Sequence, residues 1–305
     1  MKTDLRVMES LKRKHHDIVI EEEPQMAKYT SFRAGGTAKA LVFADTDQEL
    51  SDALKLVSEN GIPHIILGNG SNTLFTDDGY DGIVIKLGKE FEKITFEGSR
   101  VNCGCSILLS VLARELLNHQ LTGFEFASGI PGSLGGAVFM NAGAYGGEIK
   151  DVVKAVRVMS PDGKEIKVLS NEDMDFSYRH SALQKSGYIA LDAEMEFSKG
   201  NFDDIRNTMM ELANKRNTKQ PVNYPSAGST FKRPEGYFAG KLIEDAGLRG
   251  ISVGGAEVST LHSGFVINKD NATATDILQL ISLIQNTVYD KFGVMLEPEV
   301  RIIGK

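Results

Sequence analysis

Cysteine is scarce in this chain. Only Cys103 and Cys105 occur among its 305 residues, which is too few for a disulfide framework and leaves too few thiols for a zinc site. We therefore interpret both as small buried residues. The histidines, at positions 15, 16, 64, 119, 180 and 262, show no spacing typical of metal ligands, so we expect no metal centre.

Long apolar runs are also missing. No stretch approaches the roughly 18 apolar residues that cross a bilayer, and the basic residues 12–16 are not followed by the segments of a secretion signal. We expect a cytoplasmic protein without membrane insertion. A net charge of −7 argues against a broad nucleic-acid-binding surface. An anionic ligand would therefore need a local pocket.

Two familiar nucleotide-binding signatures are absent. Residues 68–73 (GNGSNT) follow an apolar run, but Thr73 stands where the Rossmann pattern needs a third glycine. Residues 236–241 (GYFAGK) have one residue too few before Gly-Lys and lack the following Ser or Thr of a P-loop. ATP hydrolysis is therefore not expected.

The hydrophobic pattern predicts an α+β protein. Thr46 followed by Glu49 predicts a capping box at the start of a helix that ends near Gly61. Residues 161–163 (PDG) predict a hairpin turn. Strands are expected at 40–43, 65–67, 83–85, 94–96, 100–103, 155–159, 166–169 and 188–197, and helices at 107–117, near 205–212, at 238–246 and at 277–288. Alternation predicts a last strand over 294–303, with Val294, Leu296, Val300 and Ile302 on one face and with Pro298 at an edge or an open register.

Two glycine-rich segments carry the clearest chemistry. In 68–72, successive unhindered N–H groups can form an anion-binding nest, although such a motif can also be a plain turn. Residues 127–146 combine glycine with the donors Ser128, Ser133 and Asn141. Two separate phosphate cradles suit a dinucleotide, and the alternative is a loop that packs between domains.

Seven motifs together resemble one family. They are 29–37 (YTSFRAGGT), 68–72 (GNGSN), 129–136 (GIPGSLGG) with 141–146 (NAGAYG), 178–179 (YR), 216–221 (RNTKQP), 227–234 (AGSTFKRP) and 296–300 (LEPEV). In this order they are similar to the UDP-N-acetylenolpyruvoylglucosamine reductases, over nearly the whole chain.

The resemblance implies a two-subdomain FAD-binding domain of the vanillyl-alcohol-oxidase type and a C-terminal α+β substrate-binding domain. We expect the limits 1–86, 87–200 and 201–305. It also implies reduction of the enolpyruvyl ether of UDP-N-acetylglucosamine to UDP-N-acetylmuramate in peptidoglycan synthesis, with FAD as cofactor and NADPH as electron donor. Only a few residues separate Arg179 from the strand at Tyr188, so the chain resembles the family's shorter class, which lacks a substrate-covering tyrosine insertion. A monomer is expected.

The resemblance also assigns site residues. Ser229 matches the family's proton donor, Arg179 its catalytic arginine and Glu299 its second catalytic residue, whereas alternation alone does not separate Glu299 from Glu297. The expected FAD-binding residues are Arg33, Gly68, Asn69, Gly70, Ser71, Asn72, Ala127, Ser128, Gly129, Ile130, Pro131, Gly132, Ser133, Gly135, Gly136, Asn141, Ala142 and Gly143. The expected substrate-binding residues are Tyr178, Lys219, Arg233 and Arg249.

Two other functions remain open at this point. A flavin oxidase of the same superfamily would share the cradles, although no histidine is a clear candidate for covalent attachment to the flavin. A non-catalytic nucleotide-binding module would not need Ser229, Arg179 and Glu299 together. The sequence does not distinguish NADPH from NADH.

Overall fold

The computed structural model describes residues 2–304, with side chains from residue 6 onward. The chain forms two compact units. Unit 1 contains the chain up to Glu22, Lys39–Asn69 and Gly82–Asn214, and unit 2 contains Glu23–Ala38, Gly70–Asp81 and the chain from Lys215 onward. Both units are therefore assembled from segments that lie far apart in the sequence.

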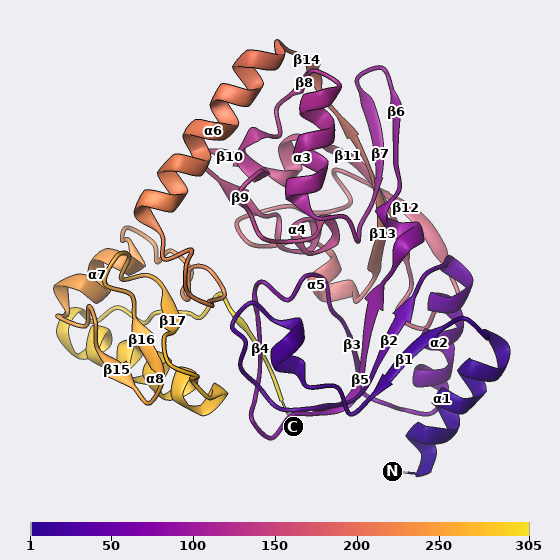
Figure 1. Ribbon diagram of the computed structural model, residues 1–305, viewed down its shortest axis with the longest axis horizontal. Helices are drawn as coiled ribbons and strands as arrows, with labels where there is room; N and C mark the ends of the chain where they lie inside the picture. Colours follow the sequence, from indigo (N-terminus) through magenta and orange to yellow (C-terminus); the bar gives the residue numbers. More distant parts are fainter. Residues whose placement is uncertain (1, 305) are drawn as a thin grey trace. The chain divides into compact units, whose positions relative to one another are not determined.

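Unit 1 contains a four-stranded sheet in the order β1-β2-β5-β3 (Figure 1). Its strands are β1 (Val19–Glu22), β2 (Ala38–Ala44), β5 (Tyr80–Leu87) and β3 (His64–Ile66). β1 is antiparallel to β2, and β3 is parallel to β5, with Ile65 opposite Val84. The N–H of Leu67 still donates to the carbonyl of Ile85, so the glycine-rich turn at Gly68 begins directly at the end of a paired strand.

Helices α1 (Lys2–Lys14) and α2 (Asp47–Glu59) contribute to the apolar core around this sheet, which buries Leu11, Leu50 and Leu54 with the strand residues. The expected capping box is confirmed. The N–H of Glu49 donates to Thr46 Oγ1, and Glu49 Oε2 accepts from the N–H of Thr46. These bonds satisfy two donors that the first helical turn would otherwise leave unpaired.

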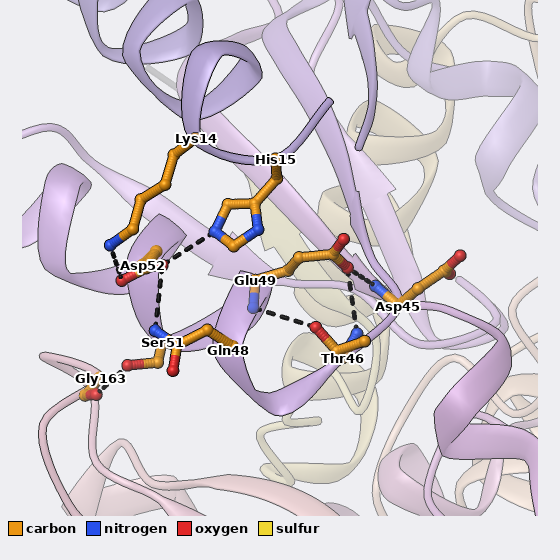
Figure 2. A network of polar contacts seen from close by, with 9 residues as sticks. All are labelled: Lys14, His15, Asp45, Thr46, Gln48, Glu49, Ser51, Asp52 and Gly163. Carbon is orange, nitrogen blue, oxygen red and sulfur yellow. Dashed lines mark hydrogen bonds and ion pairs between the residues drawn. The ribbon is translucent and has the colours of Figure 1, made fainter. Parts of the chain in front are cut away.

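A buried carboxylate ties α1 to α2 (Figure 2). Asp52 accepts from Lys14 Nζ and His15 Nε2, both at 2.8 Å, and from Gln48 Nε2 at 3.0 Å. Burial raises the pKa of Asp52, but the hydrogen bonds from these three side chains outweigh it and lower the pKa to about 2. The carboxylate is therefore ionised at neutral pH.

A second sheet of unit 1 has five strands in the order β12-β11-β13-β7-β6. They are β12 (Ile166–Ser170), β11 (Val153–Met159), β13 (Ile189–Glu196), β7 (Arg100–Gly104) and β6 (Ile94–Glu97), all antiparallel to their neighbours. Residues of α3 (Leu109–Asn118) and α4 (Leu134–Met140) are buried with its apolar face. Cys103 and Cys105 lie in this core as free thiols, as expected.

Short elements complete unit 1. They are β8 (Leu121–Thr122) paired with β14 (Ser198–Lys199), β9 (Gly143–Ala144) paired with β10 (Gly147–Glu148), the helix α5 (Leu183–Ser186), and the 3-10 turns η2 (Lys89–Glu92), η3 (Glu125–Ala127) and η4 (Ile149–Asp151). Helix α6 (Phe202–Lys219) contains the boundary between the units.

Unit 2 is built on a three-stranded antiparallel sheet, β15 (Ser252–Val253), β16 (Ala256–Val258) and β17 (Val266–Asn268), against which α8 (Ala274–Phe292) packs (Figure 1, orange and yellow). The helix α7 (Ala239–Asp245), the 3-10 turn η1 (Met26–Tyr29) and the parallel pair β4 (Thr73–Phe75) and β18 (Arg301–Ile303) complete it. Among the described residues, none of the helices combines the length and the apolar character that crossing a membrane requires.

The last strand is shorter than the alternation predicted. Leu296 and Val300 are buried as expected, but β18 begins only at Arg301, and Ile302 is 44% exposed. Pro298 has no N–H to donate and makes a single bridge to Phe231. The prediction that Ile302 shares the buried face was therefore wrong, because pairing with β4 starts after the bridge.

Candidate active site

Within unit 1, the structure brings the first two residues of the 68–72 cradle, Gly68 and Asn69, against the second cradle. Asn69 Nδ2 donates to the carbonyl of Pro131 at 2.7 Å. Gly68 lies against Ser133, so closely that a Cβ atom at position 68 would be 2.6 Å from Ser133 Oγ. Only glycine fits at position 68 without a shift of its neighbour, as the composition of the cradle suggested.

Ser133 has an unsatisfied side chain. The residue is 3% exposed, and its hydroxyl has no hydrogen-bond partner among the residues that the structure describes. It also makes no capping bond to α4, which begins at the next residue. Because a buried hydroxyl without a partner costs free energy, this atom is available for a ligand of the cradle.

Other residues of the second cradle already have protein partners. Ser128 Oγ donates to the carbonyl of Glu125 at 2.8 Å. Asn141 is fully buried in a left-handed conformation, with a φ of 43°. Its Nδ2 donates to Glu148 Oε2 and to the carbonyl of Ser177, both at 3.0 Å, and its Oδ1 accepts from the N–H of Lys150. Direct contact of the Asn141 side chain with a cofactor remains a prediction.

Arg179 occupies the tip of a tight turn that Asn141 helps to hold. Ser177 and His180 exchange two backbone hydrogen bonds, which leaves Tyr178 and Arg179 at the turn. Arg179 has a φ of 55°, and its guanidinium lies 5.1 Å from the centre of the Tyr178 ring. A positive φ at a non-glycine residue is sparsely populated and often occurs at functional sites.

Ser229 lies in unit 2 on a segment fixed on both sides. The N–H of Thr230 donates to the carbonyl of Gly264, and Thr230 Oγ1 accepts from the N–H of Val266, both at 2.9 Å. Thr230 itself is 1% exposed, whereas Ser229 is exposed. A rigid backbone therefore presents the hydroxyl-bearing residue to the surface of the unit.

A second stretch of chain, which carries Glu299, is hydrogen-bonded to the Ser229 segment. The N–H of Glu299 donates to the carbonyl of Thr230 at 2.8 Å, so the two expected catalytic residues come from adjacent, hydrogen-bonded stretches of chain. The exposed carboxylate of Glu297 pairs with Lys232. The choice of Glu299 over Glu297 stays a prediction from the motif at 296–300.

The expected basic residues of unit 2 lie at its surface. Lys219 is the last residue of α6 and is exposed. Arg233 stacks over the Phe238 ring at 4.0 Å, and Arg249 lies 3.4 Å from Glu244. Arg33 is exposed with a φ of 55°. These side chains carry local positive charge on a protein of net negative charge.

A separate cavity of about 470 Å³ lies in unit 1. It is lined by Asp47, Arg157 and Asp192, among others, and by none of the residues expected at the site. Arg157 bridges the two aspartates, with Nη1 2.6 Å from Asp47 and Nε 2.5 Å from Asp192. This cavity is therefore distinct from the cradles.

Comparisons with known proteins agree with this arrangement. Residues 220–303 match the model of the UDP-N-acetylenolpyruvoylglucosamine reductase C-terminal domain, and residues 38–169 match that of an FAD binding domain. The chain is 55% identical to the UDP-N-acetylenolpyruvoylglucosamine reductase of Clostridioides difficile over 289 residues, 95% of this chain and 94% of that protein. It is 52% identical to the corresponding reductase of Alkaliphilus oremlandii over the same fractions.

The chain belongs to the UDP-N-acetylenolpyruvoylglucosamine reductase family. A solved family structure, from Thermus caldophilus, superposes with a TM-score of 0.82 at 34% identity and covers 94% of this chain and 99% of that one. A glucose dehydrogenase, Phl p 4.0202, shares the fold alone, with a TM-score of 0.51 at 9% identity over 65% of this chain and 44% of its own.

The expected fold class is therefore confirmed. The chain combines an FAD-binding domain with a C-terminal α+β domain of the reductase family, and it is an FAD-dependent oxidoreductase. The residues present fit FAD, because Ser133 offers an unpaired buried hydroxyl and Gly68 leaves no room for a side chain between the cradles. Gly68, Asn69 and the segment from Pro131 to Ser133 would hold it.

Sequence reasoning missed the residues that fix the site. Thr230 anchors the Ser229 segment, and Glu148 holds Asn141 below the Arg179 turn. The pKa of Glu148 is lowered, first by the hydrogen bond from Lys150 and also by Asn141 and the charge of Arg179. No spacing in the sequence signals these contacts, because each joins segments that only the fold brings together.

Proposed function

We propose that this protein reduces the enolpyruvyl ether of UDP-N-acetylglucosamine to UDP-N-acetylmuramate, with NADPH as electron donor. Its curated relatives carry the name of this reductase. The observation that carries the proposal is the pairing of the Ser229 and Glu299 segments through the Glu299 N–H and the Thr230 carbonyl. It places a hydroxyl and a carboxylate on one rigid support.

FAD, when bound, supplies hydride transfer between the nicotinamide and the substrate. Arg179 would hold the carboxylate of the enolpyruvyl group, because a guanidinium offers two parallel donors to a carboxylate. Negative charge grows on that group during reduction, so a fixed cation stabilises the transition state more than the ground state.

Ser229 would donate a proton to the carbon that bears the carboxylate. A serine hydroxyl is a weak acid, but a carbanion next to a carboxylate is a strong enough base to take its proton. The exposed position of Ser229 on an anchored segment supports this role. Glu299 would act with it as the second catalytic residue, as its place in the motif at 296–300 implies. Glu297, whose carboxylate pairs with Lys232, is the alternative that alternation left open.

Charged side chains of unit 2 would bind the substrate diphosphate. Lys219, Arg233 and Arg249 supply cations, and a protein of net negative charge needs such local groups to hold an anion. Tyr178 would line the substrate site next to Arg179. The remaining expected FAD contacts, among them Arg33 and the main-chain N–H groups of residues 70–72, are part of the same proposal.

We also propose the limits 1–86 and 87–200 for two FAD-binding subdomains and 201–305 for the substrate-binding domain. Three apolar cores support a division into three parts, although the first of them also contains Met159, Ile189 and Leu191 from beyond residue 86. One centres on β2, β5 and α2, one on β7, β11 and β13, and one on α7 and α8, with Phe32, Ala34 and Leu74 added to the last from the first part of the chain.

The cellular setting follows from the proposed reaction. Its nucleotide-linked substrate and NADPH place the enzyme in the cytoplasm, in the synthesis of peptidoglycan precursors, and through the cell wall in cell shape and division. We propose a monomer that takes a small-molecule substrate and needs no nucleic-acid partner.

Anaerobic mixing tests the proposal. The purified protein is expected to be yellow, to release FAD on denaturation, to bleach with NADPH, and to regain its colour with the UDP-linked enolpyruvyl substrate. A protein that regains its colour only with oxygen would be an oxidase of the same fold. A colourless protein that takes up no FAD would contradict the cofactor assignment itself.

A further inference from the structure

Lys86 is a cation with an unusual environment. It lies on β5 next to the glycine-rich turn, and its ammonium group donates a hydrogen bond to the carbonyl of Gly68. Burial lowers the pKa of Lys86. Among the described residues, no carboxylate pairs with it, and the Gly68 carbonyl is its hydrogen-bond partner.

Other lysines of the chain show the contrast. Lys14 pairs with Asp52, Lys150 with Glu148 and Lys269 with Glu257. A largely desolvated ammonium without a counter-charge costs free energy in a folded protein, because water no longer stabilises the charge. An uncompensated cation of this kind is typical of a site where an anion binds.

The position of Lys86 indicates which anion. The carbonyl it binds belongs to Gly68, whose Cα lies against Ser133, and Ser133 Oγ is buried without a partner. The ammonium group of Lys86 and the hydroxyl of Ser133 therefore both lie against Gly68, at the junction of the two cradles. Phosphate oxygens are acceptors that both groups can satisfy.

We propose that Lys86 binds the diphosphate of FAD together with the hydroxyl of Ser133. The inference rests on the FAD assignment and not on the reaction proposed above. The competing explanation is structural: Lys86 would merely hold the Gly68 carbonyl and so shape the turn. The two explanations make opposite predictions for the protein without flavin.

The experiment compares Lys86→Met with the parental chain, both stripped of flavin. Met keeps the apolar length of lysine without its charge. The control is Lys55→Met, on a half-buried lysine of α2, a helix that contributes no residue to either cradle. FAD is titrated by its fluorescence at several salt concentrations, and the stability of each apoprotein is measured by urea unfolding.

We expect Lys86→Met to weaken FAD binding at least about tenfold, the usual order for a charge-assisted contact with phosphate. The salt dependence of FAD binding should also become shallower, because one fewer cation meets the anion. The apoprotein should be as stable as the parent or more stable, since an uncompensated charge has been removed. Lys55→Met should change none of these.

Two results would overturn the proposal. Unchanged FAD affinity in Lys86→Met would remove Lys86 from the cofactor site. Weaker FAD binding with an unchanged salt dependence and a less stable apoprotein would assign Lys86 to the shape of the turn. Should Lys86→Met not fold, Lys86→Gln, which keeps a donor for the Gly68 carbonyl without the charge, is judged by the same criteria. Failure of the parental chain to bind FAD would instead refute the cofactor assignment.

Discussion

The side-chain amide of Asn72 donates a hydrogen bond of 3.1 Å to the main-chain carbonyl of Glu299, 227 positions away in the sequence. In return, the N–H of Arg301 donates to the carbonyl of Asn72 at 3.0 Å. β4 and β18 then run parallel from this point, with Arg301 opposite Thr73. Asn72 therefore fixes the backbone on which the proposed catalytic glutamate sits.

Replacement of Asn72 by Ala should slow catalysis without loss of the cofactor. The variant removes one hydrogen bond, worth about 0.5–1.5 kcal/mol, and so we expect a two- to tenfold lower rate of substrate reduction. FAD affinity should stay within about twofold of the parent, since the amide is occupied by Glu299. Flavin fluorescence and steady-state turnover measure the two effects.

The control is Asn207→Ala, at an exposed position of α6. If Asn72→Ala lost FAD and kept its rate when resaturated with cofactor, the amide would bind the cofactor, as the motif alone suggested.

Asn72 also illustrates what the sequence could and could not predict. The motif GNGSN indicated an anion-binding turn, but only the fold places one of its side chains against a segment near the C-terminus. Asn141 is a second case, because its amide holds the Arg179 turn through Ser177. In the sequence, both residues are typical of turns, and only long-range packing decides which groups their side chains bind by hydrogen bonds.

Patterns among residues close in the sequence predicted secondary structure more reliably than motifs predicted contacts between distant segments. The Thr46–Glu49 capping box, the hairpin at Pro161–Gly163 and the apolar periodicity of α8 all depend on neighbours within a few residues, and all are present. The alternation over 294–303 wrongly predicted that Ile302 is buried, because the pairing of β18 with β4 decides which face of the strand is exposed. Local patterns thus specified most elements, whereas contacts between segments required the structure.

Asp52 should make the stability of the protein depend on acid pH. Its hydrogen bonds lower the folded-state pKa from the usual 3.8 to about 2, so the unfolded chain binds the proton more tightly. The stabilisation is therefore complete above about pH 5 and is lost as the pH falls from about 4 towards 2. At about 1.4 kcal/mol per pKa unit, the contribution is on the order of 2 kcal/mol.

Urea unfolding as a function of pH measures this contribution. Asp52→Asn should lower stability at neutral pH and flatten the acid limb of the curve, whereas Asp78→Asn, at an exposed position, should leave both unchanged. An acid limb of equal steepness in Asp52→Asn and the parent would show that other carboxylates carry the effect.

Gly68 and Ser133 should behave as a coupled pair. Gly68→Ala places a Cβ atom 2.6 Å from Ser133 Oγ, and overpacking of this kind costs about 1–3 kcal/mol. In the double variant with Ser133→Ala, the nearest Ser133 atom would be its Cβ, at 3.8 Å, so most of the lost stability should return. Denaturant unfolding of the two single variants and the double variant measures the coupling.

Gly136→Ala is the matched control, because its Cβ would lie 3.6 Å from the same oxygen and α4 favours alanine. Additive effects of Gly68→Ala and Ser133→Ala would mean that the contact does not limit position 68.

Arg179→Lys should impair only the substrate half-reaction. Lysine keeps the charge but loses the planar pair of donors that matches a carboxylate. Flavin reoxidation by the enolpyruvyl substrate should therefore slow, while flavin reduction by NADPH stays close to the parental rate. Stopped-flow absorbance separates the two, with Arg114→Lys, an exposed arginine of α3, as the control. A parental rate of reoxidation would exclude the carboxylate-binding role.

Ser229→Ala tests the proposed proton donor. Hydride delivered to the terminal carbon of the enolpyruvyl group leaves negative charge on the carbon beside the carboxylate, and that carbon then needs a proton. Loss of a general acid typically costs about 10²–10⁴ in rate, or roughly 3–5 kcal/mol. The loss should fall only on the half-reaction that needs the proton, so flavin bleaching by NADPH should be nearly normal while reoxidation by substrate slows at least about a hundredfold.

The Ser229→Ala variant should fold like the parent, because the backbone anchors at Thr230 do not involve the Ser229 side chain. The control is Ser58→Ala, at an exposed position of α2. In deuterated water, the parental enzyme should place deuterium at the carbon beside the carboxylate. Equal slowing of both half-reactions in Ser229→Ala would instead assign Ser229 to the shape of the pocket and move the proton donor elsewhere.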